Sequence, residues 1–136
     1  MIGLKLPCWR CGAKMSVIAL LAPNVEDAHG ETCILGKVED IPGNILSFIQ
    51  KRVPTYKLKY SKTAEQKYFA NTCPKCGVIY GEWFLSEEPG APFFPTEDEE
   101  AKSLYIKEIP LTSQIEISAG LSSGVGDIIL SNAKRV

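Results

Sequence analysis

The sequence predicts an α+β fold, an antiparallel β-sheet with one or two short helices, and three observations lead to this prediction. Residues 56–60 alternate between apolar and charged positions, as strands do. Residues 42–52 place apolar side chains at helical spacing. Two Cys-x-x-Cys-Gly turns, at residues 8–12 and 73–77, each run into an apolar or aromatic segment.

Length and composition predict one globular domain. The chain has 136 residues, of which 45% are hydrophobic and 23% charged, as expected of a single domain. Nine prolines and eleven glycines predict short elements and a modest core, which a metal crosslink would support. The formal net charge of −1 argues against a protein that coats nucleic acid by bulk charge.

The charges are nevertheless unevenly placed. A basic stretch contains one acidic residue, Glu65, among seven basic ones: Lys51, Arg52, Lys57, Lys59, Lys62, Lys67 and Lys75. An acidic stretch with no basic residue follows: Glu82, Glu87, Glu88, Glu97, Asp98, Glu99 and Glu100. The two stretches can pair with each other or face different partners.

The apolar residues 15–22 follow several basic residues and invite comparison with a secretory signal. The run is barely long enough, a cysteine turn occupies the basic region, and Pro23 follows directly. No stretch approaches the roughly 20 apolar residues of a membrane span. We expect no membrane association and a cytoplasmic protein, whose Cys-x-x-Cys pairs bind metal rather than form disulfides.

The first half of the chain predicts a strand, a loop and a helix. Residues 15–22 are a short apolar run that ends at Pro23, typical of a buried strand. Residues 25–36 are polar and interrupted by glycines, which predicts a loop or irregular insertion. Pro42 suits a first helical turn and Pro54 forces an end, so we expect a helix over 42–52.

Residues 56–85 predict a three-stranded antiparallel meander. Tyr56, Leu58 and Tyr60 alternate with lysines, which predicts a half-buried strand. Residues 66–72 form the return strand. Residues 78–85 are rich in β-branched and aromatic side chains and predict the third strand, joined to the second by the second cysteine turn.

The last third gives weaker signals. Residues 96–99 match the Ser/Thr-x-x-Glu capping box and predict a short helix over 97–104. Residues 105–109 and 114–118 are expected to be strands. Residues 119–126 are small and predict a flexible segment, and 127–133 fit a strand or a helix.

The two cysteine turns predict one shared metal site. Zinc prefers four tetrahedral ligands, and four cysteines are a standard structural set. A two-residue spacer lets a tight turn aim both sulfurs at one ion, and the following glycine can take positive φ. The predicted ligands are Cys8, Cys11, Cys73 and Cys76.

These turns resemble the paired knuckles of zinc-ribbon proteins, including small bacterial ones of unassigned role. The motifs Cys8-Trp9-Arg10-Cys11-Gly12 and Cys73-Pro74-Lys75-Cys76-Gly77 carry the resemblance, with 61 residues between the knuckles instead of the usual roughly 15–20. It implies a ribbon core from 1–22 and 56–95, an insertion over 23–55 and a C-terminal extension over 96–136, all within one domain. It supplies no catalytic residue.

Other interpretations of the cysteines are an iron site of the rubredoxin type and a redox pair of the thioredoxin type. A redox pair needs a helix directly after the motif, and neither turn has one in the sequence. A catalytic zinc would keep an open position, whereas four thiolates close the shell. We therefore expect a structural metal.

Three further groups are candidates for function. His29 and Cys33 can be a nucleophile pair, but a surface histidine and a small buried thiol are the simpler interpretation. Five aromatic residues can be core or exposed platform, with Phe93 and Phe94 expected to be the most exposed: Tyr80, Trp83, Phe84, Phe93 and Phe94. The lysines of residues 57–67 can be a solvated face or a contact for nucleic acid.

Together these observations predict a non-enzymatic binding protein with a structural zinc. We expect a protein partner, contacted through aromatic and acidic residues, as in inhibitors or immunity proteins. The alternative is a nucleic-acid-binding zinc ribbon that uses the lysine-bearing hairpin. The sequence does not indicate an oligomeric state.

Overall fold

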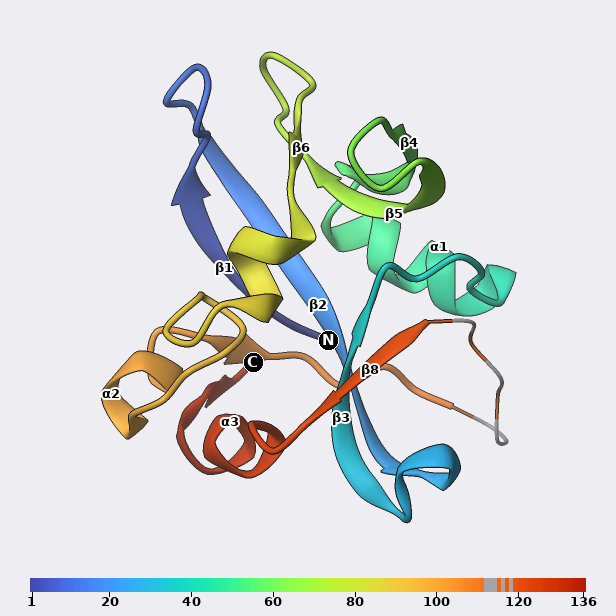
Figure 1. The fold of residues 1–136 in the computed structure, drawn as a ribbon, viewed down its shortest axis with the longest axis vertical. Helices are drawn as coiled ribbons and strands as arrows, with labels where there is room; N and C mark the ends of the chain where they lie inside the picture. The colour runs from blue at the N-terminus through green and yellow to red at the C-terminus, as the bar shows by residue number, and fades with distance from the viewer. Residues whose placement is uncertain (112–114, 116, 118) are drawn as a thin grey trace.

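The computed structural model describes residues 1–111, 115, 117 and 119–136, and these form a mixed α+β fold with two β-sheets (Figure 1). The strands are β1 (Ile2–Pro7), β2 (Lys14–Val25), β3 (Glu31–Gly36), β4 (Tyr56–Ser61), β5 (Gln66–Thr72), β6 (Ile79–Tyr80), β7 (Tyr105–Ile106), β8 (Gly120–Ser123) and β9 (Lys134–Arg135). The helices are η1 (Glu26–Ala28), α1 (Gly43–Arg52), the π-helix η2 (Trp83–Glu87), α2 (Asp98–Ala101) and α3 (Gly126–Asn132). The predicted α+β class is confirmed.

The larger sheet has six strands in the order β8-β3-β2-β1-β7-β9 and is organised around β2. Antiparallel β1 pairs with the first half of β2, and antiparallel β3 pairs with its second half from Leu20 onward. Alternate residues of a strand point to opposite faces. Val17 and Ala19 accordingly join one hydrophobic cluster and Ile18 and Leu20 the other. Because β2 is buried on both faces, residues 15–22 form a continuous apolar run instead of an alternating one.

The strand β2 extends beyond the predicted end at Pro23. It continues to Val25 through an irregularity in its pairing with β3, where Asn24 adopts a φ of 53°. The prediction of a loop or irregular insertion over residues 25–36 was wrong for its second half, because Glu31–Gly36 forms β3 inside the larger sheet. Its apolar run is only three residues long, which is why its composition resembled a loop.

Helix α1 confirms the predicted helix almost residue for residue. It begins after the N-cap Pro42 and ends before Val53. Ile45 and Ile49 are buried and pack with Ile18 and Leu20 of β2 in one hydrophobic cluster. The helix thus covers one face of the larger sheet.

The smaller sheet has the predicted meander order β4-β5-β6. Its last strand is shorter than expected, because β6 contains two residues and the predicted strand residues 83–85 instead begin η2. The prediction of a half-buried β4 was also wrong in part: Tyr56 is buried, but Leu58 and Tyr60 are 46% and 56% exposed. The tip of this hairpin therefore projects into solvent on both faces.

One buried amide joins the two sheets. Asn71 of β5 accepts a hydrogen bond from the Ile18 N–H at 2.8 Å and donates one to the Ile18 carbonyl at 3.0 Å. On the edge of β2 that faces β3, strand pairing begins only at Leu20, so the backbone of Ile18 has no partner among the described strands on that edge. The Asn71 amide bonds to the Ile18 backbone in its place. It satisfies backbone groups that would be costly to bury unpaired.

The C-terminal third completes the larger sheet. β7 pairs with β1, β9 pairs with β7, and β8 pairs with β3. Segment 119–126, predicted to be flexible, contains β8, and residues 127–133 form most of helix α3. The predicted strand over 105–109 is limited to β7, while the strand predicted over 114–118 falls largely outside the described residues.

Helix α2 is shorter than the predicted 97–104 and is capped differently. Its N-cap is Glu97, and the Thr96 N–H donates to the Glu100 carboxylate at 2.9 Å. Glu99, expected to close the capping box, instead forms an ion pair with Lys102 at 2.8 Å.

In the described part of the chain, no helix has the length and apolar character needed to cross a bilayer.

Gly3 provides a test of the packing between β1 and β7. A Cβ added at this residue would lie 2.6 Å from the Tyr105 ring and 2.9 Å from the Val17 carbonyl oxygen. We expect Gly3→Ala to lower the free energy of unfolding by about 1–3 kcal/mol, as overpacking does. Chemical denaturation measures this loss.

The matched control is Gly43→Ala in α1, where an added Cβ meets no atom within 4 Å. This substitution should leave stability unchanged or raise it by up to about 1 kcal/mol, since alanine favours helix. Equal stability of both variants would show that Tyr105 does not pack against Gly3 as described.

Candidate metal centre

The first cysteine turn is the loop of the β1–β2 hairpin. The Cys8 N–H donates to the Ala13 carbonyl at 2.8 Å, and the Gly12 N–H donates to the Cys8 carbonyl at 3.0 Å. Gly12 has a φ of 74°, a conformation that side chains with a Cβ rarely adopt. The predicted positive φ is confirmed, and this turn directs both sulfurs out of the hairpin end.

The second cysteine turn repeats this geometry in the loop between β5 and β6. The Cys73 N–H donates to the Val78 carbonyl at 2.9 Å, and the Gly77 N–H donates to the Cys73 carbonyl at 3.0 Å. Gly77 has a φ of 77°. Both loops lie at one end of the molecule (Figure 1), so two hairpins distant in sequence present matching turns to each other.

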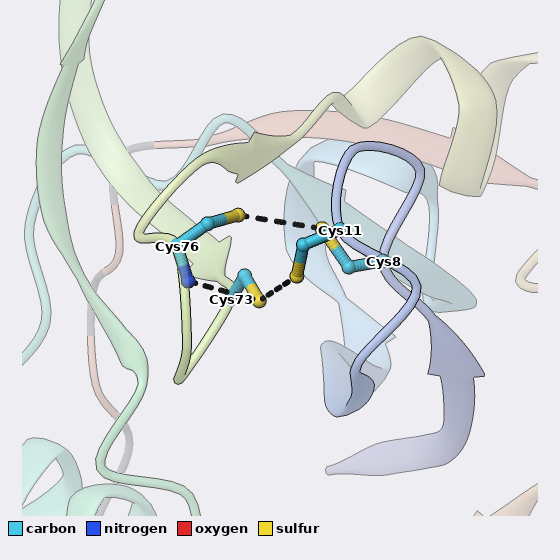
Figure 2. Close-up of side chains that lie close together, drawn as sticks. All are labelled: Cys8, Cys11, Cys73 and Cys76. Atoms are coloured by element: carbon cyan, nitrogen blue, oxygen red, sulfur yellow. Dashed lines mark hydrogen bonds between the residues drawn. The ribbon is translucent and has the colours of Figure 1, made fainter.

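The four predicted ligands come together as one cluster (Figure 2). Sγ of Cys8 lies 3.6 Å from that of Cys76, Sγ of Cys11 lies 3.5 Å from that of Cys73, and all four sulfurs lie within 4.8 Å of one another. Disulfide sulfurs are about 2.05 Å apart, whereas tetrahedral Zn–S bonds of about 2.3 Å place sulfurs about 3.8 Å apart. The four cysteines can therefore hold a metal ion.

Backbone N–H groups favour the thiolate form of the buried cysteine in each turn. The N–H groups of Cys76 and Lys75 lie 3.5 and 3.4 Å from Cys73 Sγ, and these hydrogen bonds lower the pKa of Cys73 to about 6 against the effect of burial. The corresponding N–H groups of Cys11 and Arg10 lower the pKa of Cys8. Each turn thus stabilises a ligand in its metal-binding state.

The thiolate form of Cys76 is disfavoured by the other three cysteines. A hydrogen bond from the Val78 N–H favours the Cys76 thiolate, but burial and the three neighbouring cysteine side chains outweigh it and raise the pKa of Cys76 to about 11. A cation among the sulfurs would remove this repulsion. Metal binding would then release protons, so its affinity should increase with pH.

The cluster has a buried side and an exposed side. Cys8 and Cys73 are buried and pack in the hydrophobic cluster with Leu85 and Phe93, while Cys11 and Cys76 reach the surface. Four thiolates would complete a tetrahedral shell and leave no position for a substrate. This chemistry fits a structural role.

Trp9 links the two turns and was not singled out by the sequence. The residue is 63% exposed, yet its indole Nε1–H donates to the Ile79 carbonyl of β6 at 3.0 Å. This hydrogen bond joins the same two hairpins as the sulfur cluster. A tryptophan between two cysteines was the available signal, but its acceptor is 70 residues away.

The structure separates His29 and Cys33 from this cluster and supports their simpler interpretation. His29 is exposed at the end of η1, and Cys33 is fully buried in β3. Burial and the charge of Glu31 raise the pKa of the Cys33 thiol, the opposite of nucleophile activation.

The aromatic residues are arranged differently from the prediction. Phe93 was expected to be exposed but is buried, its N–H donating to the Leu85 carbonyl at 2.7 Å, and Phe94 is half-buried. Trp83 and Phe84 are instead 58% and 63% exposed. The prolines around Phe93 shape a turn that folds onto the core rather than a projecting loop.

Comparisons with protein-family models, curated proteins and solved structures found no match to this chain. The resemblance to zinc ribbons therefore rests on the two cysteine turns alone.

The cysteine cluster predicts a large loss of stability when one candidate ligand is removed. Cys11→Ser changes an exposed side chain, so little packing is lost directly. We expect this variant to lose the metal and its cooperative melt, because structural metal binding contributes about 10 kcal/mol or more to folding. Metal analysis and thermal denaturation with and without a chelator measure both effects.

Cys33→Ala is the control, since this cysteine lies in β3 away from the cluster. It should keep one metal ion per chain and lose on the order of 1–2 kcal/mol, as trimming of a core side chain does. A metal-free wild-type chain that melts like the metal-treated one would exclude the structural metal.

The Trp9 hydrogen bond predicts a smaller, separate contribution. Trp9→Phe should lower the free energy of unfolding of the metal-loaded protein by about 1 kcal/mol, because the Ile79 carbonyl loses its donor. Trp83→Phe is the control, since the Trp83 indole has no hydrogen-bond partner in the described part of the chain. Equal stability of the two variants in urea denaturation would refute the link.

Proposed function

We propose that this chain is a small non-enzymatic binding protein, fastened by a structural zinc bound to Cys8, Cys11, Cys73 and Cys76. The sulfur spacing and the closed four-thiolate set support the metal. Zinc is preferred over iron because four cysteines are a standard structural zinc set and because the turns resemble zinc-ribbon knuckles. The free thiols fit the reducing cytoplasm.

One observation carries the proposal of a protein partner: two adjacent aromatic side chains are held outward from an anchored helix. Trp83 and Phe84 begin η2 and are more than half exposed, while the next two residues, Leu85 and Ser86, are buried. The Phe84 ring lies against Gly81, where an added Cβ would be 3.4 Å away. Large aromatics held in place lose little conformational entropy on binding and are typical hot spots of interfaces.

Exposed acidic residues indicate the charge of the partner. Glu87 and Glu88 are exposed at the end of η2, and residues 97–100 of the acidic stretch are exposed further along the chain. Among these described residues, Glu99 is the one that forms an ion pair. We therefore propose a partner with a basic surface, as an inhibitor or immunity protein would have, since complementary charge favours association.

Nucleic-acid binding is the second candidate, and the β4–β5 hairpin favours it. Lys57, Lys59 and Lys67 are exposed beside the exposed Leu58 and Tyr60. None of these lysines forms an ion pair with the described residues. Unpaired cations beside an aromatic side chain are what a single-stranded backbone and its bases require.

Reciprocal variants distinguish the two functions. The protein retained by the zinc-loaded chain in a pull-down from the native host is first identified and then titrated with purified wild type. Trp83→Ala with Phe84→Ala should weaken this complex by about 30-fold or more, since hot-spot truncations cost at least about 2 kcal/mol. Lys57→Ala with Lys59→Ala should leave it within a few-fold.

Single-stranded DNA is titrated against the same variants at several salt concentrations. Binding that falls steeply with salt and disappears with the lysine pair, while no protein complex depends on the aromatic pair, would reverse the ranking of the two functions.

A further inference from the structure

A cleft of about 410 Å³ opens between η2 and one end of the larger sheet, and no cysteine of the cluster lines it. One wall is formed by η2 and its preceding residue, through Glu82, Ser86 and Glu87. The opposite wall is formed by the ends of β3 and β8, which pair with each other. Its volume lies within the range of small-molecule sites, about 300–1,000 Å³.

The β3–β8 wall carries little side-chain bulk because two glycines face each other across the strands. Gly36 pairs with Gly120, and neither has a positive φ, so backbone conformation does not require glycine at either position. Glycine within strands weakens them and often marks the close approach of a ligand. The neighbouring pair Ile34 and Ser122 adds one apolar and one hydroxyl side chain.

The charge of the cleft is negative. Three carboxylates line it, Glu39, Glu82 and Glu87, against one ammonium, Lys37. No ion pair joins Lys37 to any of these three described residues. Burial, with a contribution from Glu87, raises the pKa of Glu82 to about 7 despite the opposing effects of the Lys37 backbone N–H and ammonium. A cation in the cleft would relieve this unfavourable charge.

The Ser86 hydroxyl lies on the same wall as the Glu82 and Glu87 carboxylates. Ser86 is 7% exposed and lines the cleft, and its accessible Oγ forms no side-chain hydrogen bond with the described residues. Such a hydroxyl can bond to water or to a ligand in the cleft. The Glu82 carboxylate is close to the bare wall, with Oε2 3.6 Å from the position of a Cβ on Gly36. An acceptor and a hydroxyl thus border the same space.

We propose that this cleft binds an organic cation, an alkylammonium or guanidinium group whose N–H donors reach Glu82, Glu87 and Ser86 while its carbon chain lies against Ile34. The cation is either a free small amine or a lysine or arginine side chain of a partner. The second source rests on the proposed protein partner. The first does not, and neither requires the metal to be zinc.

Two model cations test the cleft by NMR titration of the zinc-loaded full chain. Agmatine represents a free amine, and the blocked peptide acetyl-Gly-Arg-Gly-amide represents a side chain. The peptide with glutamine in place of arginine is the neutral control, and Ca²⁺ tests for a simple acidic cation site. We expect the cations to shift the backbone amides of Gly36, Ser86 and Gly120.

Three variants locate the binding. Glu82→Gln removes the central charge and should weaken binding about tenfold or more. Gly120→Ala adds one methyl group to the wall, where its Cβ makes only an ordinary 3.6 Å contact with the Gly36 carbonyl oxygen, and should also weaken binding without unfolding the chain. Glu26→Gln, at an exposed position in η1 outside the cleft, should bind like wild type.

Each outcome decides the proposal. Binding of agmatine alone identifies a free amine as the ligand, and binding of the arginine peptide shows that the cleft accepts a partner's side chain. The proposal is overturned if the glutamine peptide binds as well as the arginine peptide, if Ca²⁺ binds and the amines do not, or if Glu82→Gln keeps the wild-type affinity. It is also overturned if no amide shifts at 20 mM cation, since even a weak site with a Kd of about 1 mM would be nearly saturated there. These results do not depend on Trp83 or Phe84, so they can fail while the proposed partner surface stands.

Discussion

Four thiolates can occupy a space less than 4.8 Å across only if a cation compensates their charge, and the fold brings four cysteine sulfurs to that separation. Burial and the three neighbouring cysteine side chains raise the pKa of Cys76 to about 11, so its thiolate is disfavoured without a cation. The attraction to a shared metal would join two hairpins separated by 61 residues. Each hairpin belongs to a different sheet, so a metal at this centre would fasten the two sheets together.

Two further contacts connect the sheets near this centre, and they differ in character. Asn71 replaces a strand neighbour at Ile18 inside the core, with both hydrogen bonds buried. Trp9 joins the turns at the surface through a single hydrogen bond to Ile79. The metal site would supply the strength, while these polar contacts fix the relative position of the hairpins. Beyond the site, η2 presents its aromatic pair on one side and its acidic and hydroxyl groups to the cleft on another.

The elements predicted well from sequence are those encoded by nearby residues. Pro42 and Pro54 bound α1, the alternation of residues 56–60 marks β4, and glycine after each cysteine pair has the expected positive φ. The candidate ligands were found for the same reason: each motif is complete within five residues. Because the two motifs match, the sequence predicts that they share one metal site.

The missed features depend on contacts that lie outside the local sequence pattern. Glu31–Gly36 is a strand because β2 and β8 flank it, although its sequence has only a short apolar run. Phe93 is buried because its turn folds onto Leu85, and the segment around Trp83 favours strand by composition but forms a helix. The acceptor of Trp9 and the cleft between η2 and β8 are likewise invisible to local patterns.

X-ray absorption spectroscopy of the purified, metal-loaded chain tests the central claim most directly, because it reports the metal and its ligands together. The account predicts a zinc edge with four sulfur neighbours at about 2.3 Å and no oxygen or nitrogen in the shell. A mixed shell, fewer than four sulfurs, or a chain with no stoichiometric metal and its four cysteines in disulfides would contradict it.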